Sequence, residues 1–81
     1  MSYQVEYSPQ FEKTIAKLKK RDALIYGRVR DKVAEIIDNP EHYKPLRGSE
    51  FGKRRAHVGC FVIKFVVRND IIKILEFGHH D

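Results

Sequence analysis

The chain has 81 residues, of which 42% are hydrophobic, and this length supports a single domain over residues 1–81. Its 16 Lys and Arg residues outnumber 11 Asp and Glu residues, which gives a net charge of +5. No apolar run approaches the roughly 20 residues that a membrane-spanning helix needs, and nothing resembles a signal peptide. The single cysteine, Cys60, excludes an internal disulfide, so the composition predicts a cytoplasmic protein with no membrane partner.

The chain begins with the pattern of a strand and a helix. Residues 3–7 alternate between apolar and polar side chains, which predicts a half-buried strand. Ser8-Pro9 is typical of a helix N-cap followed by proline at the first helical position. Three apolar residues at helical spacing then predict a helix over about residues 9–20: Phe11, Ile15 and Leu18.

A second helix is expected after Asp22, whose side chain suits an N-cap. Its apolar stripe consists of Ile25, Val29, Val33 and Ile36. Asn39-Pro40 is expected to end it, because the residue before proline is disfavoured in the helical conformation.

The second half of the chain predicts three strands, over residues 53–58, 60–67 and 71–77, with a turn or bulge at Gly59. The predicted order is therefore β-α-α-β-β-β. We expect an α+β fold, with an N-terminal strand and a two-helix antiparallel hairpin packed on one face of a small, mainly antiparallel, twisted sheet.

One helical hairpin covers only one face of such a sheet, so the other face is expected to be open or bound to a partner. Alternation assigns four residues of the middle strand to the core: Phe61, Ile63, Phe65 and Val67. The same alternation gathers four polar side chains on the open face: Lys53, Arg55, His57 and Lys64. Residues 44–64 carry six basic side chains against Glu50 alone, which suits RNA or an acidic protein segment.

The sequence has no metal-binding or nucleotide-binding signature, and we expect neither a metal nor a cofactor. Metal-free RNA cleavage requires activation of the 2′-hydroxyl, neutralisation of the phosphorane charge and protonation of the leaving 5′-oxygen. Histidine serves the proton transfers and arginine or lysine the charge. From composition alone, however, a solvated charged sheet face with incidental terminal histidines is the favoured interpretation.

Several motifs, taken together in their order along the chain, favour a functional interpretation instead. Pro45-Leu46-Arg47-Gly48 is followed by Arg55-Ala56-His57-Val58-Gly59, an aromatic-rich hairpin, and Phe77-Gly78-His79-His80-Asp81. This arrangement resembles the RelE/ParE toxin superfamily over essentially the whole chain. The run from Gly52 to Val58 is most similar to the YafQ-like branch.

The resemblance implies a compact toxin that cleaves mRNA on the ribosome, is neutralised by a cognate antitoxin, and is monomeric or weakly dimeric when free. It implies three catalytic residues: Arg55, His57 and His80. Lys53 and Arg55 match basic strand positions that contact RNA, His57 matches a histidine of the YafQ-like branch, and His80 matches a C-terminal Arg or His. The expected RNA- and phosphate-binding residues are Lys44, Arg47, Lys53, Arg54, Lys64 and His79.

Two departures leave alternatives open. Val62 stands where most RelE-like members have an arginine, which the YafQ-like branch also lacks, and no aromatic residue follows the terminal segment. The alternatives are a ParE-like inhibitor of DNA gyrase and a catalytically lapsed member that binds an antitoxin.

Overall fold

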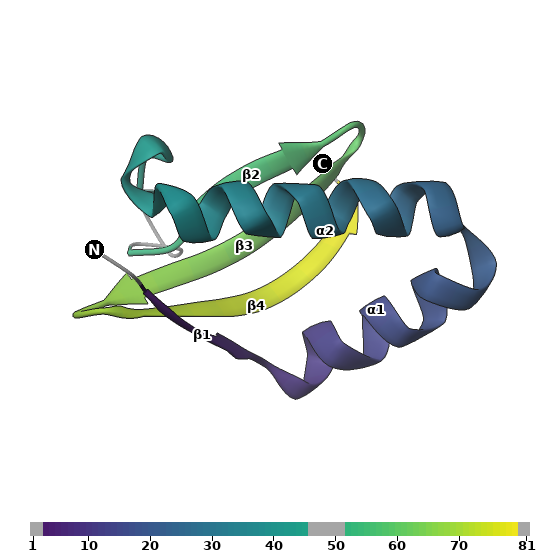
Figure 1. Cartoon of the computed structure of the whole chain (residues 1–81), viewed down its shortest axis with the longest axis horizontal. Coiled ribbons are helices and arrows are strands. Elements are labelled where there is room, and N and C mark those ends of the chain that lie inside the picture. Colours follow the sequence, from purple (N-terminus) through teal and green to yellow (C-terminus); the bar gives the residue numbers. More distant parts are fainter. Residues whose placement is uncertain (1–2, 46–51, 80–81) are drawn as a thin grey trace.

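The computed structural model describes residues 3–45 and 52–79 of the chain. Its elements are β1 (Gln4–Tyr7), α1 (Pro9–Arg21), α2 (Ala23–Asp38), the 3-10 helix η1 (Pro40–His42), β2 (Arg54–Val58), β3 (Phe61–Arg68) and β4 (Ile71–His79). This order confirms the predicted β-α-α-β-β-β arrangement and α+β class (Figure 1). Within these residues, no helix is both long enough and apolar enough to cross a membrane.

Both helices begin at the residues that the sequence predicts. The Ser8 hydroxyl accepts a hydrogen bond from the Phe11 amide at 3.0 Å, so Ser8 caps α1. Asp22 serves both helices: its amide donates to the Leu18 carbonyl at 2.8 Å, and its carboxylate accepts from the Ile25 amide at 3.2 Å. Asn39 closes α2 by donating its amide to Glu35. A single residue therefore joins the helices, which fixes them as a tight hairpin.

The strands form one mixed sheet in the order β1-β4-β3-β2. Strands β2, β3 and β4 make an antiparallel meander, whereas β1 pairs in parallel with β4 at the edge of the sheet. Ser8 reinforces this edge, because its amide donates to the Ile74 carbonyl at 2.9 Å and its hydroxyl to the Leu75 carbonyl. The sheet is mainly antiparallel, as predicted.

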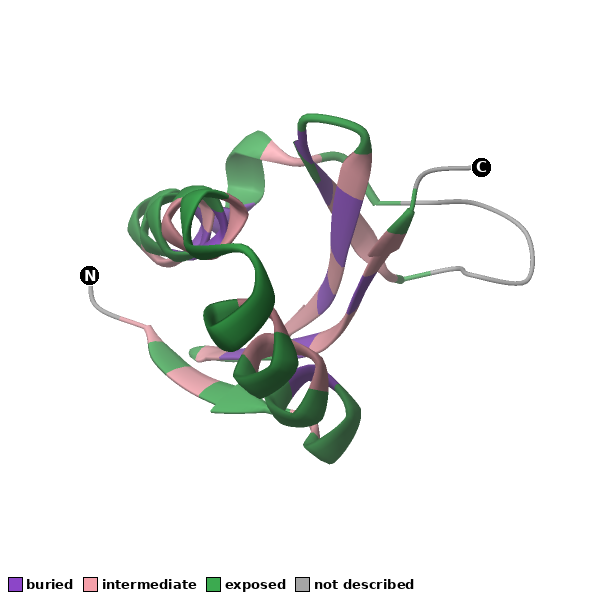
Figure 2. Ribbon diagram, turned by 90° about the vertical axis from the view of Figure 1, so that its right-hand side faces the viewer, coloured by how far each residue is buried: buried purple, intermediate pink, exposed green. Residues whose placement is uncertain are grey.

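The core lies between the helices and one face of the sheet (Figure 2). Ile63 and Phe65 on β3 are fully buried there, as the alternation predicts. The other members of the cluster come from every major element except β1: Phe11, Val29, Val33, Ile36, Ala56, Val58, Ile72, Ile74 and Phe77. The opposite face of the sheet carries neither helix, so it is the open face that the topology leaves for function.

The ends of the strands differ slightly from the prediction. Lys53 and Cys60 lie just outside β2 and β3. Gly59 has a φ of 61°, a left-handed conformation that glycine adopts without steric cost, and it starts the tight β2–β3 turn. β4 extends past Phe77 to His79, because its last residues still pair with β3.

Candidate functional site

The register of the sheet brings charged residues of three strands to the open face. Arg55 on β2 lies opposite Lys64 on β3, and Lys64 lies opposite Glu76 on β4. His57 lies opposite Val62, which in turn pairs with Gly78. Directly opposite residues share one face, so the open face is defined here by Arg55, His57, Val62, Lys64, Glu76 and Gly78.

Three residues predicted for this surface are therefore brought together: Arg55, His57 and Lys64. Arg55 and Lys64 are half-buried, and His57 is exposed. Lys53, predicted to join them, is half-buried directly before β2. The grouping places two cationic side chains beside an imidazole, which is the combination that can hold a phosphate and exchange a proton near it.

Glu76 belongs to this surface, and the sequence did not reveal it. Its carboxylate Oε1 lies 3.7 Å from the Lys64 Nζ, and the two side chains are 40% and 19% exposed. The register of β3 and β4 shifts at this point, because Lys64 pairs with Glu76 whereas the next residue, Phe65, pairs with Ile74. Leu75 therefore has no paired residue on β3. This bulge changes which residues of β4 face outward, so simple alternation cannot place Glu76.

The neighbourhood of His57 is less polar. Val62 lies on the open face but is only 5% exposed, and it is not part of the core cluster. Gly78 contributes no side chain, and no other described atom lies within 4 Å of the position that a Cβ there would take. Among the described residues, none therefore fills the position beside Gly78.

Arg54 and His79, both predicted to bind RNA, lie elsewhere. The Arg54 guanidinium donates hydrogen bonds to the carbonyls of Tyr43 at 2.8 Å and Pro40 at 3.4 Å. The His79 ring lies over Phe61, with 4.5 Å between ring centroids, on the side of the sheet that Phe61 shares with Phe77. Neither side chain joins the open face.

Of the remaining predicted residues, Lys44 is exposed and immediately precedes Pro45, which bridges to β2. Lys44 therefore lies in the segment between η1 and β2, outside the sheet. Arg47 and His80 lie outside the described residues.

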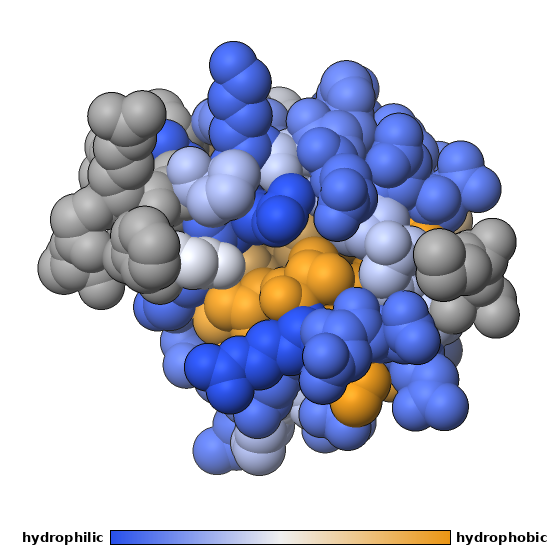
Figure 3. Space-filling view, turned by 90° about the vertical axis from the view of Figure 1, so that its left-hand side faces the viewer, coloured by the Kyte–Doolittle hydropathy of each residue, from blue (hydrophilic) through white to orange (hydrophobic). Residues whose placement is uncertain are grey.

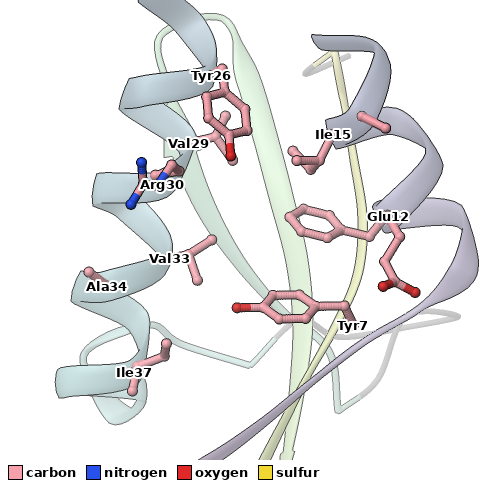
Figure 4. A pocket seen from close by; sticks show the side chains of 11 residues that line it. Tyr7, Glu12, Ile15, Tyr26, Val29, Arg30, Val33, Ala34 and Ile37 are labelled. Carbon is pink, nitrogen blue, oxygen red and sulfur yellow. The ribbon is translucent and has the colours of Figure 1, made fainter. Parts of the chain in front are cut away.

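A groove between α1 and α2 is a second surface feature, with a volume of about 520 Å³. Figure 4 shows Val29, Val33 and Ile37 of α2 facing Tyr7 and Ile15 across the groove. Apolar surface in a hollow surrounded by hydrophilic side chains is also visible on the face of the molecule drawn in Figure 3. Tyr7 was expected on the half-buried face of β1 but is 44% exposed, because its ring stacks on Phe11 at the groove rather than entering the core. The groove exposes apolar surface on a chain of only 81 residues.

Comparison with known proteins places the chain in a family. The family described as ParE toxin of the type II toxin–antitoxin system parDE matches residues 5–81. A protein of Methanocaldococcus jannaschii that carries the name toxin RelE4 is 37% identical over 82 residues, covering 98% of this chain and 87% of its own length.

Solved structures share the fold at low sequence identity. The YoeB/ParE toxin from Agrobacterium tumefaciens is 12% identical, with a TM-score of 0.84 over 96% of this chain and 99% of its own. A chain of the DinJ–YafQ toxin–antitoxin complex of E. coli is 22% identical, with a TM-score of 0.75 over 99% of this chain and 94% of its own. The chain belongs to the RelE/ParE superfamily of toxins of type II toxin–antitoxin systems.

Proposed function

We propose that this toxin is a metal-independent endoribonuclease that cleaves mRNA on the ribosome and thereby inhibits translation in the cytoplasm. The observation that carries the proposal is the shared position of Arg55, Lys64 and His57 on the open face. A sheet face that carries two cations and an imidazole suits a phosphodiester better than a neutral protein surface.

The proposed reaction is attack of the ribose 2′-oxygen on the adjacent phosphorus. A base removes the 2′-hydroxyl proton as the new P–O bond forms, and an acid protonates the 5′-oxygen as its bond to phosphorus breaks. The products are a 2′,3′-cyclic phosphate and a 5′-hydroxyl. No electrons are transferred, so the reaction needs no oxidant or reductant.

Arg55, with Lys64 and Lys53 beside it, is assigned to the charge of the phosphorane. Arginine presents fixed donors that match two phosphate oxygens, whereas lysine acts as a point charge. His57 is assigned to one proton transfer and His80 to the other. The assignment of His80 rests on the resemblance of its motif, because His80 lies outside the described residues.

The ribosome and an antitoxin are the proposed partners. A basic face this small binds free RNA weakly and loses affinity steeply with salt, so the ribosome would supply the remaining positioning of the message. The E. coli relative is part of a toxin–antitoxin complex. For this chain, we propose an antitoxin segment that folds on binding and covers the apolar groove between α1 and α2.

Induced expression followed by primer extension on a reporter mRNA tests the proposal. We expect cuts within the translated region that disappear when the start codon is removed. DNA damage without RNA cuts would instead identify a gyrase inhibitor, the activity left open by the ParE name of the matching family. Growth inhibition without either lesion would exclude both activities.

A further inference from the structure

Glu76 is an acidic side chain on the open face next to Lys64, and the proposed reaction gives it no part. We propose that Glu76 is a positioning residue that holds the Lys64 ammonium for the RNA phosphate and limits the affinity of the open face for RNA. The effect of Glu76 on cleavage rests on the proposed function. Its effect on RNA binding rests on the geometry of the sheet.

Three charged residues form a row across neighbouring strands: Arg55 on β2, Lys64 on β3 and Glu76 on β4. Arg55 lies directly opposite Lys64, and like charges in such positions repel. Glu76 lies on the other side of Lys64, with its Oε1 3.7 Å from the Lys64 Nζ. The carboxylate therefore offsets the repulsion and gives the flexible lysine stem a preferred position.

Lys64 can contact a ligand from this position. An ammonium group has three N–H donors, so a lysine that contacts a carboxylate can also donate to a phosphate oxygen. The Lys64 side chain is 19% exposed, so part of it reaches solvent. A phosphate held by Arg55 would thus meet an ammonium whose place is already set, and ordering the lysine on binding would cost less.

The same carboxylate has an opposite effect on affinity. Glu76 is 40% exposed beside the proposed phosphate position, where its negative charge repels RNA and competes for Lys64. Removing that charge should tighten binding while loosening the geometry needed for cleavage. A residue that only supported the fold would change neither quantity in this opposed way.

The variant that tests this is Glu76→Gln, which preserves the side-chain shape and removes the charge. Its matched control is Glu6→Gln on β1, which makes the same change in net charge. Glu6 is exposed and pairs with Lys73 on β4, so β4 separates it from Lys64. Screening by salt weakens the effect of such a remote charge on the open face.

The first measurement is the affinity of each full-length protein for a short single-stranded RNA at several salt concentrations. We expect Glu76→Gln to bind about threefold more tightly, with a salt slope steeper by about 0.7, the contribution of one further phosphate contact. Glu6→Gln should behave like the wild type. Equal affinities and slopes for the two variants would overturn the binding half of the inference.

The second measurement is mRNA cleavage in a translating extract. We expect Glu76→Gln to lower the KM and to lower kcat about tenfold, since small losses of alignment carry costs of this order. A kcat equal to that of Glu6→Gln would overturn the positioning half. If the wild type does not cleave, the proposed function fails, and the binding measurement still decides whether Glu76 limits affinity.

A charge exchange separates positioning from simple ion pairing. The double variant Lys64→Glu with Glu76→Lys keeps an ion pair between β3 and β4 but moves the ammonium away from Arg55. We expect its melting temperature to approach that of the wild type and its cleavage to remain at least tenfold low. Recovery of full cleavage would show that any ion pair suffices, and the inference would be wrong.

Discussion

Arg54 and Tyr43 are joined by a hydrogen bond of 2.8 Å from the guanidinium Nη1 to the backbone carbonyl oxygen. The same nitrogen lies 3.4 Å from the Pro40 carbonyl oxygen. One arginine of β2 thus ties the end of the helical layer to the sheet. This gives Arg54 a structural role, although it stands between two residues proposed to contact RNA.

We therefore expect Arg54→Ala to reduce the free energy of unfolding by about 1.5–3 kcal/mol, because two part-buried carbonyls lose a charged donor. Chemical denaturation followed by circular dichroism measures this. Arg68→Ala, on an exposed arginine at the end of β3, is the control and should change stability by less than about 0.5 kcal/mol. Equal stability of the two variants would contradict the role of Arg54.

Arg55 is expected to be indispensable for toxicity. Removing a preorganised charge donor typically costs about 10²–10³ in rate, so Arg55→Ala should abolish growth inhibition and mRNA cleavage. His80→Ala should do the same through loss of a proton transfer. His42→Ala is the control, because His42 is an exposed residue of η1 that contacts Tyr43. The proposed site is wrong if Arg55→Ala and His80→Ala retain the wild-type cleavage pattern.

Val62 offers a test by gain of activity. An arginine there would stand beside His57 and extend over Gly78, where the described atoms leave space. We expect Val62→Arg to raise the cleavage rate at least tenfold by adding a phosphate donor. Val66→Arg, on the same strand but opposite Lys73, should not. A rate for Val62→Arg no higher than that of Val66→Arg would show that no donor is missing.

The groove between the helices should govern neutralisation rather than toxicity. Ala34 is exposed on α2 and lines this groove, so Ala34→Glu would place a charge under a bound antitoxin segment. We expect at least a tenfold loss of antitoxin affinity by calorimetry and toxicity that persists during antitoxin co-expression. Ala23→Glu, at the exposed start of the same helix, should remain neutralised. Unchanged affinity in Ala34→Glu would place the antitoxin elsewhere.

The elements of this fold were predictable because their signals are local. The apolar stripe from Val29 to Ile36 and the alternation around Ile63 each report burial within a few residues. Helix ends were equally predictable from the sequence, because the Ser8 and Asp22 side chains accept hydrogen bonds from amides only three residues away. These signals give the hairpin, the strands and the core side of β3.

Pairing between distant segments was not predictable in the same way. The parallel placement of β1 beside β4 depends on which edge of the meander is available, and the alternation within β1 does not specify that edge. The outward position of Glu76 depends on a bulge at Leu75, and the inward position of Arg54 depends on carbonyls of another element. Because charge and alternation do not report such distant contacts, they grouped Arg54 with the predicted RNA-binding residues.

The pairing of β1 with β4 also determines when the four-stranded sheet can form during synthesis. Ser8 is anchored to backbone carbonyls of Ile74 and Leu75, and Leu75 follows Ser8 by 67 residues. A ribosome therefore synthesises both helices, β2 and β3 before β1 has a partner, and this long-range closure favours slow folding. Until β4 emerges, the row from Arg55 to Glu76 also lacks its third strand. A nascent chain of this toxin thus acquires the row from Arg55 to Glu76 only after β4 has been synthesised.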